Sequence, residues 1–121
     1  DVQNEQSIWY WSKYVECMDM DKDGESETIL VFGTSGQNNF DDGRVFIEIY
    51  YKGNLISIEH QNGVKDLERI TLINPAFYKL PSAIQDKVKY KMKQMVSEKQ
   101  TIFPNNWEQS MAMKKTEIRE N

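Results

Sequence analysis

Segment 19–27, Asp-Met-Asp-Lys-Asp-Gly-Glu-Ser-Glu, holds the residues of this chain whose types and spacing could do chemistry. Carboxylates stand at its positions 1, 3, 5 and 9, and glycine stands at position 6. Five acidic side chains within nine residues repel one another unless a cation lies between them. Hard oxygen ligands in that number suit Ca²⁺, and the glycine permits the sharp turn that wraps them around one ion. The segment therefore predicts a calcium site.

Two loop families share this opening, and the flanking residues separate them. An EF-hand places a bidentate glutamate at position 12 and a helix on each side. Here position 12 is Leu30, and the flanks 8–17 and 28–32 are rich in the aromatic and β-branched residues that favour strands. The sequence therefore predicts a strand-loop-strand site that closes at position 9.

That pattern resembles the short calcium loops of FG-GAP and VCBS-type repeats, as in integrin propellers. The resemblance implies four side-chain ligands, namely Asp19, Asp21, Asp23 and Glu27. It also implies that Glu25 offers its backbone carbonyl. Position 9 is more often Asp in such loops, so the longer Glu27 is a departure that can change how this ligand coordinates. No second copy of the motif occurs, and 121 residues are too few for a propeller, so the resemblance covers only the loop and its flanks. The alternative is a solvated acidic turn without a metal.

The strands that must position this loop follow from the apolar pattern. Alternating apolar side chains predict strands at 44–51 and 55–60, joined by a tight turn, and a further strand at 70–73. The segment 33–43 is rich in Gly, Asn and Asp, which is typical of a loop. Consecutive short strands joined by tight turns form an antiparallel meander.

The last third of the chain changes to helical spacing. One apolar stripe predicts a helix that opens at Ser82 as its N-cap; the stripe consists of Ile84, Val88, Met92, Met95 and Val96. Pro104 then breaks the chain, a short second helix can follow over 107–115, and the charged tail 117–121 is expected to fray. We expect a single α+β domain over 1–121, with an antiparallel β-meander of about five strands and one C-terminal helix packed on it.

Composition narrows the class of protein. A hydrophobic content of 39% and an aromatic content of 12% indicate a folded domain with one core. The net charge of −4 argues against a nucleic-acid binder. No apolar run approaches the roughly 20 residues that a membrane span needs. A single cysteine, Cys17, excludes an internal disulfide and a Cys-based zinc site.

The expected calcium affinity bears on the compartment. Simple calcium modules bind at roughly 10⁻⁴–10⁻³ M, a level met outside the cell or in a periplasm. The chain also opens at Asp1 without a signal peptide. We therefore expect an exported, bacterial-type protein, either periplasmic or secreted. Membrane anchoring through a removed N-terminal segment is left open.

A wider set of short motifs points the same way. The stretches 14–27, 31–36, 41–44 and 50–53 resemble small exported proteins of Gram-negative bacteria. Those proteins are largely uncharacterised and are sometimes labelled as involved in surface polysaccharide biosynthesis. The resemblance implies an exported protein and supplies no mechanism.

Two functions fit the remaining polar residues. A binding module would contact a surface glycan or protein at the end of the sheet opposite the calcium loop, with a candidate surface of Asn38, Asn39, Asp41, Asp42, Arg44, His60 and Asn62. A small hydrolase would instead use Asp41, Asp42 and His60 as its acid-base set. The plain alternatives are a turn for Asp-Asp-Gly and a structural role for the histidine.

The sequence favours the binding module. It lacks a nucleophile elbow, a zinc-protease motif, a Walker A loop and a dinucleotide fingerprint, so we assign no catalytic residue. The strand 28–32 separates the two loops by about 17 Å, so Asp41 and Asp42 are not expected to bind the calcium ion. Ca²⁺ is therefore predicted as a structural ion, and neither nucleic acid nor a membrane span is expected.

Overall fold

The computed structural model describes residues 7–10, 14–36, 39–62, 69–99 and 101–120. For residues 7–10, 35–36 and 39–42 it describes the backbone alone.

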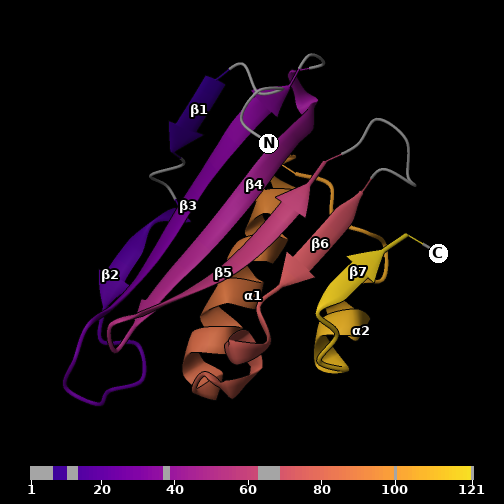
Figure 1. The fold of residues 1–121 in the computed structure, drawn as a ribbon. Helices are drawn as coiled ribbons and strands as arrows, with labels where there is room; N and C mark the ends of the chain where they lie inside the picture. The colour runs from indigo at the N-terminus through magenta and orange to yellow at the C-terminus, as the bar shows by residue number, and fades with distance from the viewer. Residues whose placement is uncertain (1–6, 11–13, 37–38, 63–68, 100, 121) are drawn as a thin grey trace.

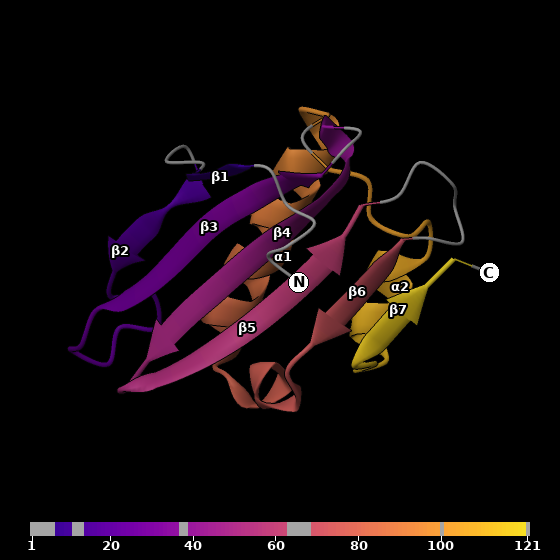
Figure 2. The same cartoon turned by 45° about the horizontal axis from the view of Figure 1, so that its top comes forward.

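Within these residues, seven antiparallel strands form one sheet, which Figures 1 and 2 show from two directions. Both β1 (Ser7–Tyr10) and β2 (Glu16–Met18) pair with β3, β1 toward its end and β2 at its start. The sheet then continues in the order β3 (Glu27–Gly36), β4 (Asn39–Tyr51), β5 (Asn54–Gln61), β6 (Ile70–Ile73) and β7 (Glu117–Arg119). The chain therefore runs as a meander from β3 to β6 and returns to the far edge as β7.

Two helices cover one face of this sheet (Figure 2). A 3-10 helix, Pro75–Lys79, leads from β6 into α1 (Ser82–Ser97), and α2 (Trp107–Ala112) lies beside it on the same side. The N-cap of α1 is Pro81, so Ser82 is the first helical residue and not the cap that its residue type predicts. Neither helix combines the length and the apolar content that crossing a membrane requires, within the described part of the chain.

The core lies between the helices and the sheet face that they cover. The predicted helical stripe is buried from Ile84 to Met95, whereas Val96 is 40% exposed. Alternate residues of the central strands meet this stripe, and all are buried: Ile29, Val31, Val45, Ile47, Ile49, Ile56 and Ile58. Each such side chain contributes roughly 1.5–3 kcal/mol on burial, so these strands hold the site residues on a rigid platform.

The predicted α+β class, an antiparallel meander with a C-terminal helix, is confirmed, and the short second helix is present as α2. One prediction within it was wrong. The segment 33–43 is mostly strand, because β3 continues to Gly36 and β4 begins at Asn39. Thr34 pairs with Arg44 on one side, and β1 pairs with β3 on the other. Pairing on both sides satisfies the backbone groups and overrides the loop-like composition.

Both ends of the chain also differ from expectation. The flank 8–17 is not one strand but two, β1 and β2, which pair with different parts of β3. The tail does not fray through Arg119, because β7 pairs with β6 and Ile118 is buried in the core. Glu120 then forms an ion pair with Arg69 at 3.5 Å, which holds the residue that follows β7. One buried isoleucine and one ion pair thus outweigh the charged composition of this segment.

Candidate metal centre

The acidic loop connects β2 to β3 at one end of the sheet (Figure 1). Met18 pairs directly with Glu27, so the hairpin register brings the first and last acidic residues of the loop, Asp19 and Glu27, close together. Between them the backbone adopts positive φ at Lys22 (60°) and at Gly24 (95°). Glycine tolerates this conformation at no steric cost, which explains the glycine at position 6.

Four acidic side chains meet within this loop. Each of Asp19, Asp21, Asp23 and Glu27 places one carboxylate oxygen within 4.8 Å of the corresponding oxygens of the others. Backbone N–H groups of the loop donate to them: Asp23 N–H to Asp19 Oδ1 at 3.1 Å, Gly24 N–H to Asp19 Oδ2 at 2.9 Å, and Glu25 N–H to Asp23 Oδ1 at 2.9 Å. These bonds hold the loop wrapped around its own carboxylates.

Glu27 differs from the three aspartates because its side chain is buried. It is only 1% exposed. The backbone N–H of Met20 donates to Glu27 Oε1 at 2.7 Å, whereas Oε2 is buried without a hydrogen-bond partner among the described residues. A buried carboxylate oxygen without a partner is costly, and a cation among the four carboxylates would remove that cost.

The crowding also shifts the protonation of the aspartates. Partial desolvation raises the pKa of Asp21, and the neighbouring carboxylates of Asp23 and Glu27 raise it further. The pKa of Asp23 is lowered, first by the N–H of Glu25 and also by the ammonium of Lys52. Adjacent carboxylates thus shift in opposite directions, which is the behaviour of like charges that share one site.

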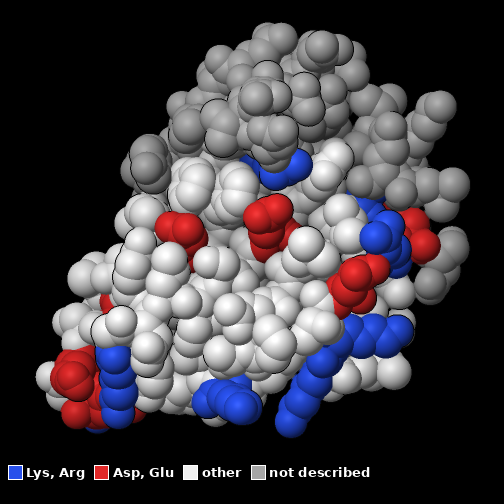
Figure 3. Space-filling view, in the orientation of Figure 1, with Lys and Arg blue, Asp and Glu red and all other residues white. Residues whose placement is uncertain are grey.

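Glu25 and Lys52 complete the surroundings of the cluster. The side chain of Glu25 is exposed and outside the cluster, and its backbone N–H is bonded to Asp23. Lys52 reaches the loop from the β4–β5 turn, with its Nζ 3.5 Å from Asp23 Oδ2. Figure 3 shows acidic side chains gathered at this end of the sheet with a basic side chain alongside. Sequence reasoning missed Lys52, since only the strand register brings it to the loop.

The strand that leads into the loop is fastened to α1. Glu16 accepts hydrogen bonds from Lys87 and Lys91, both at 2.8 Å, and these lower its pKa. Just before β2, the hydroxyl of Tyr14 donates to Glu98. No sequence pattern pointed to these residues. β2 cannot move away from α1 without breaking these partly buried contacts.

At the opposite end of the sheet lies the predicted binding surface. Arg44 pairs with Gln61, and Asn62 N–H donates to Gly43 O at 2.9 Å, so Arg44 of β4 lies beside the end of β5, away from the acidic loop. The side chains of Asn38, Asn39, Asp41 and Asp42 lie outside the described part of the structure. Arg44 is half-buried and lies 3.8 Å from Glu59.

His60 and Asn62 are buried and form a polar network instead of a surface. The ring Nδ1 of His60 lies 2.8 Å from Thr71 Oγ1, and its Nε2 lies 2.8 Å from Ile102 O. Thr101 donates to Asn62 Oδ1 at 2.9 Å. Burial lowers the pKa of His60 to about 4, so the imidazole is neutral at pH 7. The network ties the segment after α1 to the sheet.

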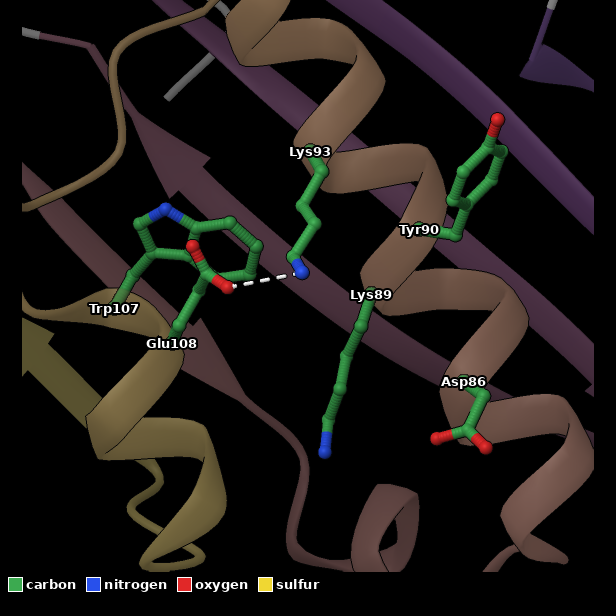
Figure 4. A pocket seen from close by; sticks show the side chains of 6 residues that line it. All are labelled: Asp86, Lys89, Tyr90, Lys93, Trp107 and Glu108. Carbon is green, nitrogen blue, oxygen red and sulfur yellow. Dashed lines mark ion pairs between the residues drawn. The ribbon is translucent and has the colours of Figure 1, made fainter.

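A separate hollow of about 340 Å³ lies between α1 and α2 (Figure 4). Trp107 and Tyr90 contribute its aromatic groups, and its charged groups balance as two of each sign: Asp86, Lys89, Lys93 and Glu108. Lys93 and Glu108 form an ion pair at 3.2 Å, with both side chains largely exposed. This balanced, solvated lining does not select one class of ligand, so the acidic loop is the stronger candidate site.

The chain matches no known protein family, no curated protein and no solved structure. The assignment of the metal centre therefore rests on the geometry of its own residues.

Proposed function

We propose that this chain is a calcium-binding module in which one Ca²⁺ is held by Asp19, Asp21, Asp23 and Glu27. The observation that carries the proposal is the buried carboxylate of Glu27. Its Oε2 has no hydrogen-bond partner among the described residues, and its carboxylate lies within 4.8 Å of three others. Burying an unpaired charge beside like charges is strongly unfavourable, and a divalent cation supplies the partner that all four carboxylates need.

The ligand set favours calcium over other divalent ions. Four carboxylates and the backbone carbonyl that the loop resemblance assigns to Glu25 would supply most of a six- to eight-coordinate oxygen shell. Mg²⁺ demands a tighter octahedral shell and gives up its waters reluctantly, so it should bind less well. Zn²⁺ prefers nitrogen and sulfur ligands, which are not found among the four clustered side chains.

The ion has a structural role in this proposal. A catalytic metal needs an open coordination position beside a general base. Among the described residues, the basic group that contacts the cluster is the ammonium of Lys52, which is protonated and cannot act as a base at pH 7. The ion would instead hold β2 against β3 and so fix the start of the central strand.

The biological setting that we propose is an exported interaction module. Its support is the motif resemblance to small exported proteins and the affinity range of simple calcium modules, roughly 10⁻⁴–10⁻³ M. The partner would be a surface glycan or protein that contacts the end of the sheet opposite the loop. A hydrolase gains no support, because His60 is 1% exposed and its ring nitrogens bond to a hydroxyl, an amide and a carbonyl.

Thermal unfolding with added calcium and with a chelator tests the proposal. At free Ca²⁺ of 100 times the dissociation constant, the ion should stabilise the folded chain by about 2.7 kcal/mol. Glu25→Gln is the matched control for Glu27→Gln, because each removes one acidic charge from the same loop. Wild type and Glu25→Gln should both melt higher in calcium, and Glu27→Gln should not. Identical melting curves of the wild type in the two conditions would reject the proposal.

A further inference from the structure

Among the described residues, Lys52 brings a cationic side chain to the cluster from another part of the fold. Lys52 lies in the two-residue turn between Tyr51 and Asn54, which are paired across β4 and β5. Its Nζ is 3.5 Å from Asp23 Oδ2, and the two side chains are 50% and 23% exposed. This contact joins the turn of hairpin β4–β5 to the loop of hairpin β2–β3. The turn and the loop are far apart in sequence.

The backbone at Lys52 is unfavourable for a lysine. Its φ is 48°, and that of Gly53 is 81°, so both central residues of the turn have positive φ. Turns of this kind prefer Asn, Asp or Gly at the first central position, because other side chains clash there. Lysine is therefore unfavourable at this position. Its ammonium lies 5.5 Å from the centroid of the neighbouring Tyr51 ring and also contacts Asp23, a proposed metal ligand.

We infer that Lys52 sets the affinity and ion selectivity of the metal centre, because its ammonium and the metal ion compete for Asp23. This inference rests on the proposed calcium site. Without metal, the ammonium partly neutralises the cluster at Asp23. With metal, the ion and the ammonium lie close together and repel each other. Lys52 therefore stabilises the metal-free loop and weakens binding, and the β4–β5 turn is fastened to the loop more firmly when the ion is absent.

The repulsion must scale with the charge of the bound ion. A trivalent lanthanide is repelled one and a half times as strongly as Ca²⁺ at the same place, so its logarithmic change in affinity is larger in that ratio. Because both side chains are partly exposed, salt must also screen the effect. A packing change at the turn would show neither dependence.

Calorimetric titration of the full chain with Ca²⁺ and with Tb³⁺ tests the inference at low and at high ionic strength. Lys52→Met and Lys52→Asn remove the charge, and asparagine suits the turn, so at least one variant should keep the native fold. Lys52→Arg keeps the charge. Lys114→Met is the matched control, because Lys114 has a similar φ of 60° and follows α2 toward β7, at the far edge of the sheet (Figure 1).

At low salt, both neutral variants of Lys52 should bind Ca²⁺ about three- to tenfold more tightly than the wild type. Their gain in affinity for Tb³⁺ should be about the calcium factor raised to the power 1.5. Lys52→Arg and Lys114→Met should stay within about twofold of the wild type, and high salt should shrink every difference. Unchanged affinity in every neutral variant that keeps the native fold, or a gain in only one where both fold, would overturn the inference and leave the calcium site standing. If the wild type itself binds neither ion, the site and the inference both fail.

Discussion

Two buried titratable side chains lie at opposite ends of the sheet and differ in how their burial is balanced. Glu27 begins β3 beside the acidic loop, and His60 lies near the end of β5; each is 1% exposed. Both ring nitrogens of His60 have hydrogen-bond partners, whereas one carboxylate oxygen of Glu27 has none among the described residues.

The comparison shows how the surroundings of a buried group distinguish a structural residue, His60, from a proposed metal ligand, Glu27. His60 tolerates burial because it remains neutral, since its pKa falls to about 4. Its ring nitrogens also form hydrogen bonds with Thr71 and with the carbonyl of Ile102. Glu27 lies among three further carboxylates, so the single hydrogen bond from the N–H of Met20 does not balance its surroundings. The same degree of burial is therefore balanced by a hydrogen-bond network at one end and, in the function that we propose, by a cation at the other.

Removing the histidine should have the largest effect. His60→Ala leaves a cavity and unpaired polar groups at Thr71 and Ile102, which should lower the free energy of unfolding by about 2–4 kcal/mol. The loss should be the same in calcium and in chelator, as measured by urea unfolding at pH 7. Gln61→Ala, at the neighbouring exposed position, should change stability by no more than about 0.5 kcal/mol. If the loss of stability in His60→Ala differed between calcium and chelator, the contrast between His60 and Glu27 would be wrong.

The pH dependence of stability should carry the signature of the same histidine. Because its pKa is about 4 in the folded protein and 6.5 as the ordinary value, the unfolded chain binds more protons between these values. The stabilising contribution is thus present above pH 6.5 and is lost as pH falls toward 4. Between pH 7 and pH 5 the free energy of unfolding should fall by about 2 kcal/mol. Unfolding curves of His60→Gln should lack this part of the slope; an unchanged slope would show that another group causes it.

Neutralising the other buried group should act in the opposite direction. In chelator, Glu27→Gln removes one of four crowded negative charges and keeps an oxygen for the N–H of Met20. It should therefore raise the free energy of unfolding by about 1 kcal/mol while abolishing the response to calcium. Glu25→Gln, at the exposed position of the same loop, should do neither. Destabilisation of Glu27→Gln in chelator would mean that the loop balances this charge without a cation.

The fastening of β2 to α1 should have the smallest effect. Glu16→Gln loses two ion pairs, of which the one to Lys91 is largely buried, so stability should fall by about 1 kcal/mol at pH 7. Lys87→Met, which removes only the more exposed pair, should cost about half as much or less. Urea unfolding measures the stability of both variants. A larger loss of stability in Lys87→Met than in Glu16→Gln would show that Lys91 is not the more important partner of Glu16.

The local parts of this structure could be predicted from the sequence. The acidic loop carries its spacing and its turn glycine within nine residues, so the clustered carboxylates follow from 19–27 alone. The helical stripe from Ile84 to Met95 and the hairpin of β4 with β5 likewise depend on near neighbours. These predictions needed only periodicity and turn chemistry.

The remaining parts depend on contacts between distant segments. Residues 33–35 became strand because β1 pairs along this part of β3, and the tail was ordered by pairing of β7 with β6. Lys52 reaches Asp23 only through the register of three consecutive strands. The burial of His60 requires the segment after α1 to return across the sheet. Composition carries no information about such long-range pairing.

Calcium titration by isothermal calorimetry, on the wild type and on Glu27→Gln, tests the central claim most directly. The claim is that the cluster around the unpartnered oxygen of Glu27 is a metal site. The wild type and Glu25→Gln should each bind about one Ca²⁺ per chain, in the range of roughly 10⁻⁴–10⁻³ M, and Glu27→Gln should bind none. No heat of binding in the wild type, or equal binding by Glu27→Gln, would contradict the claim.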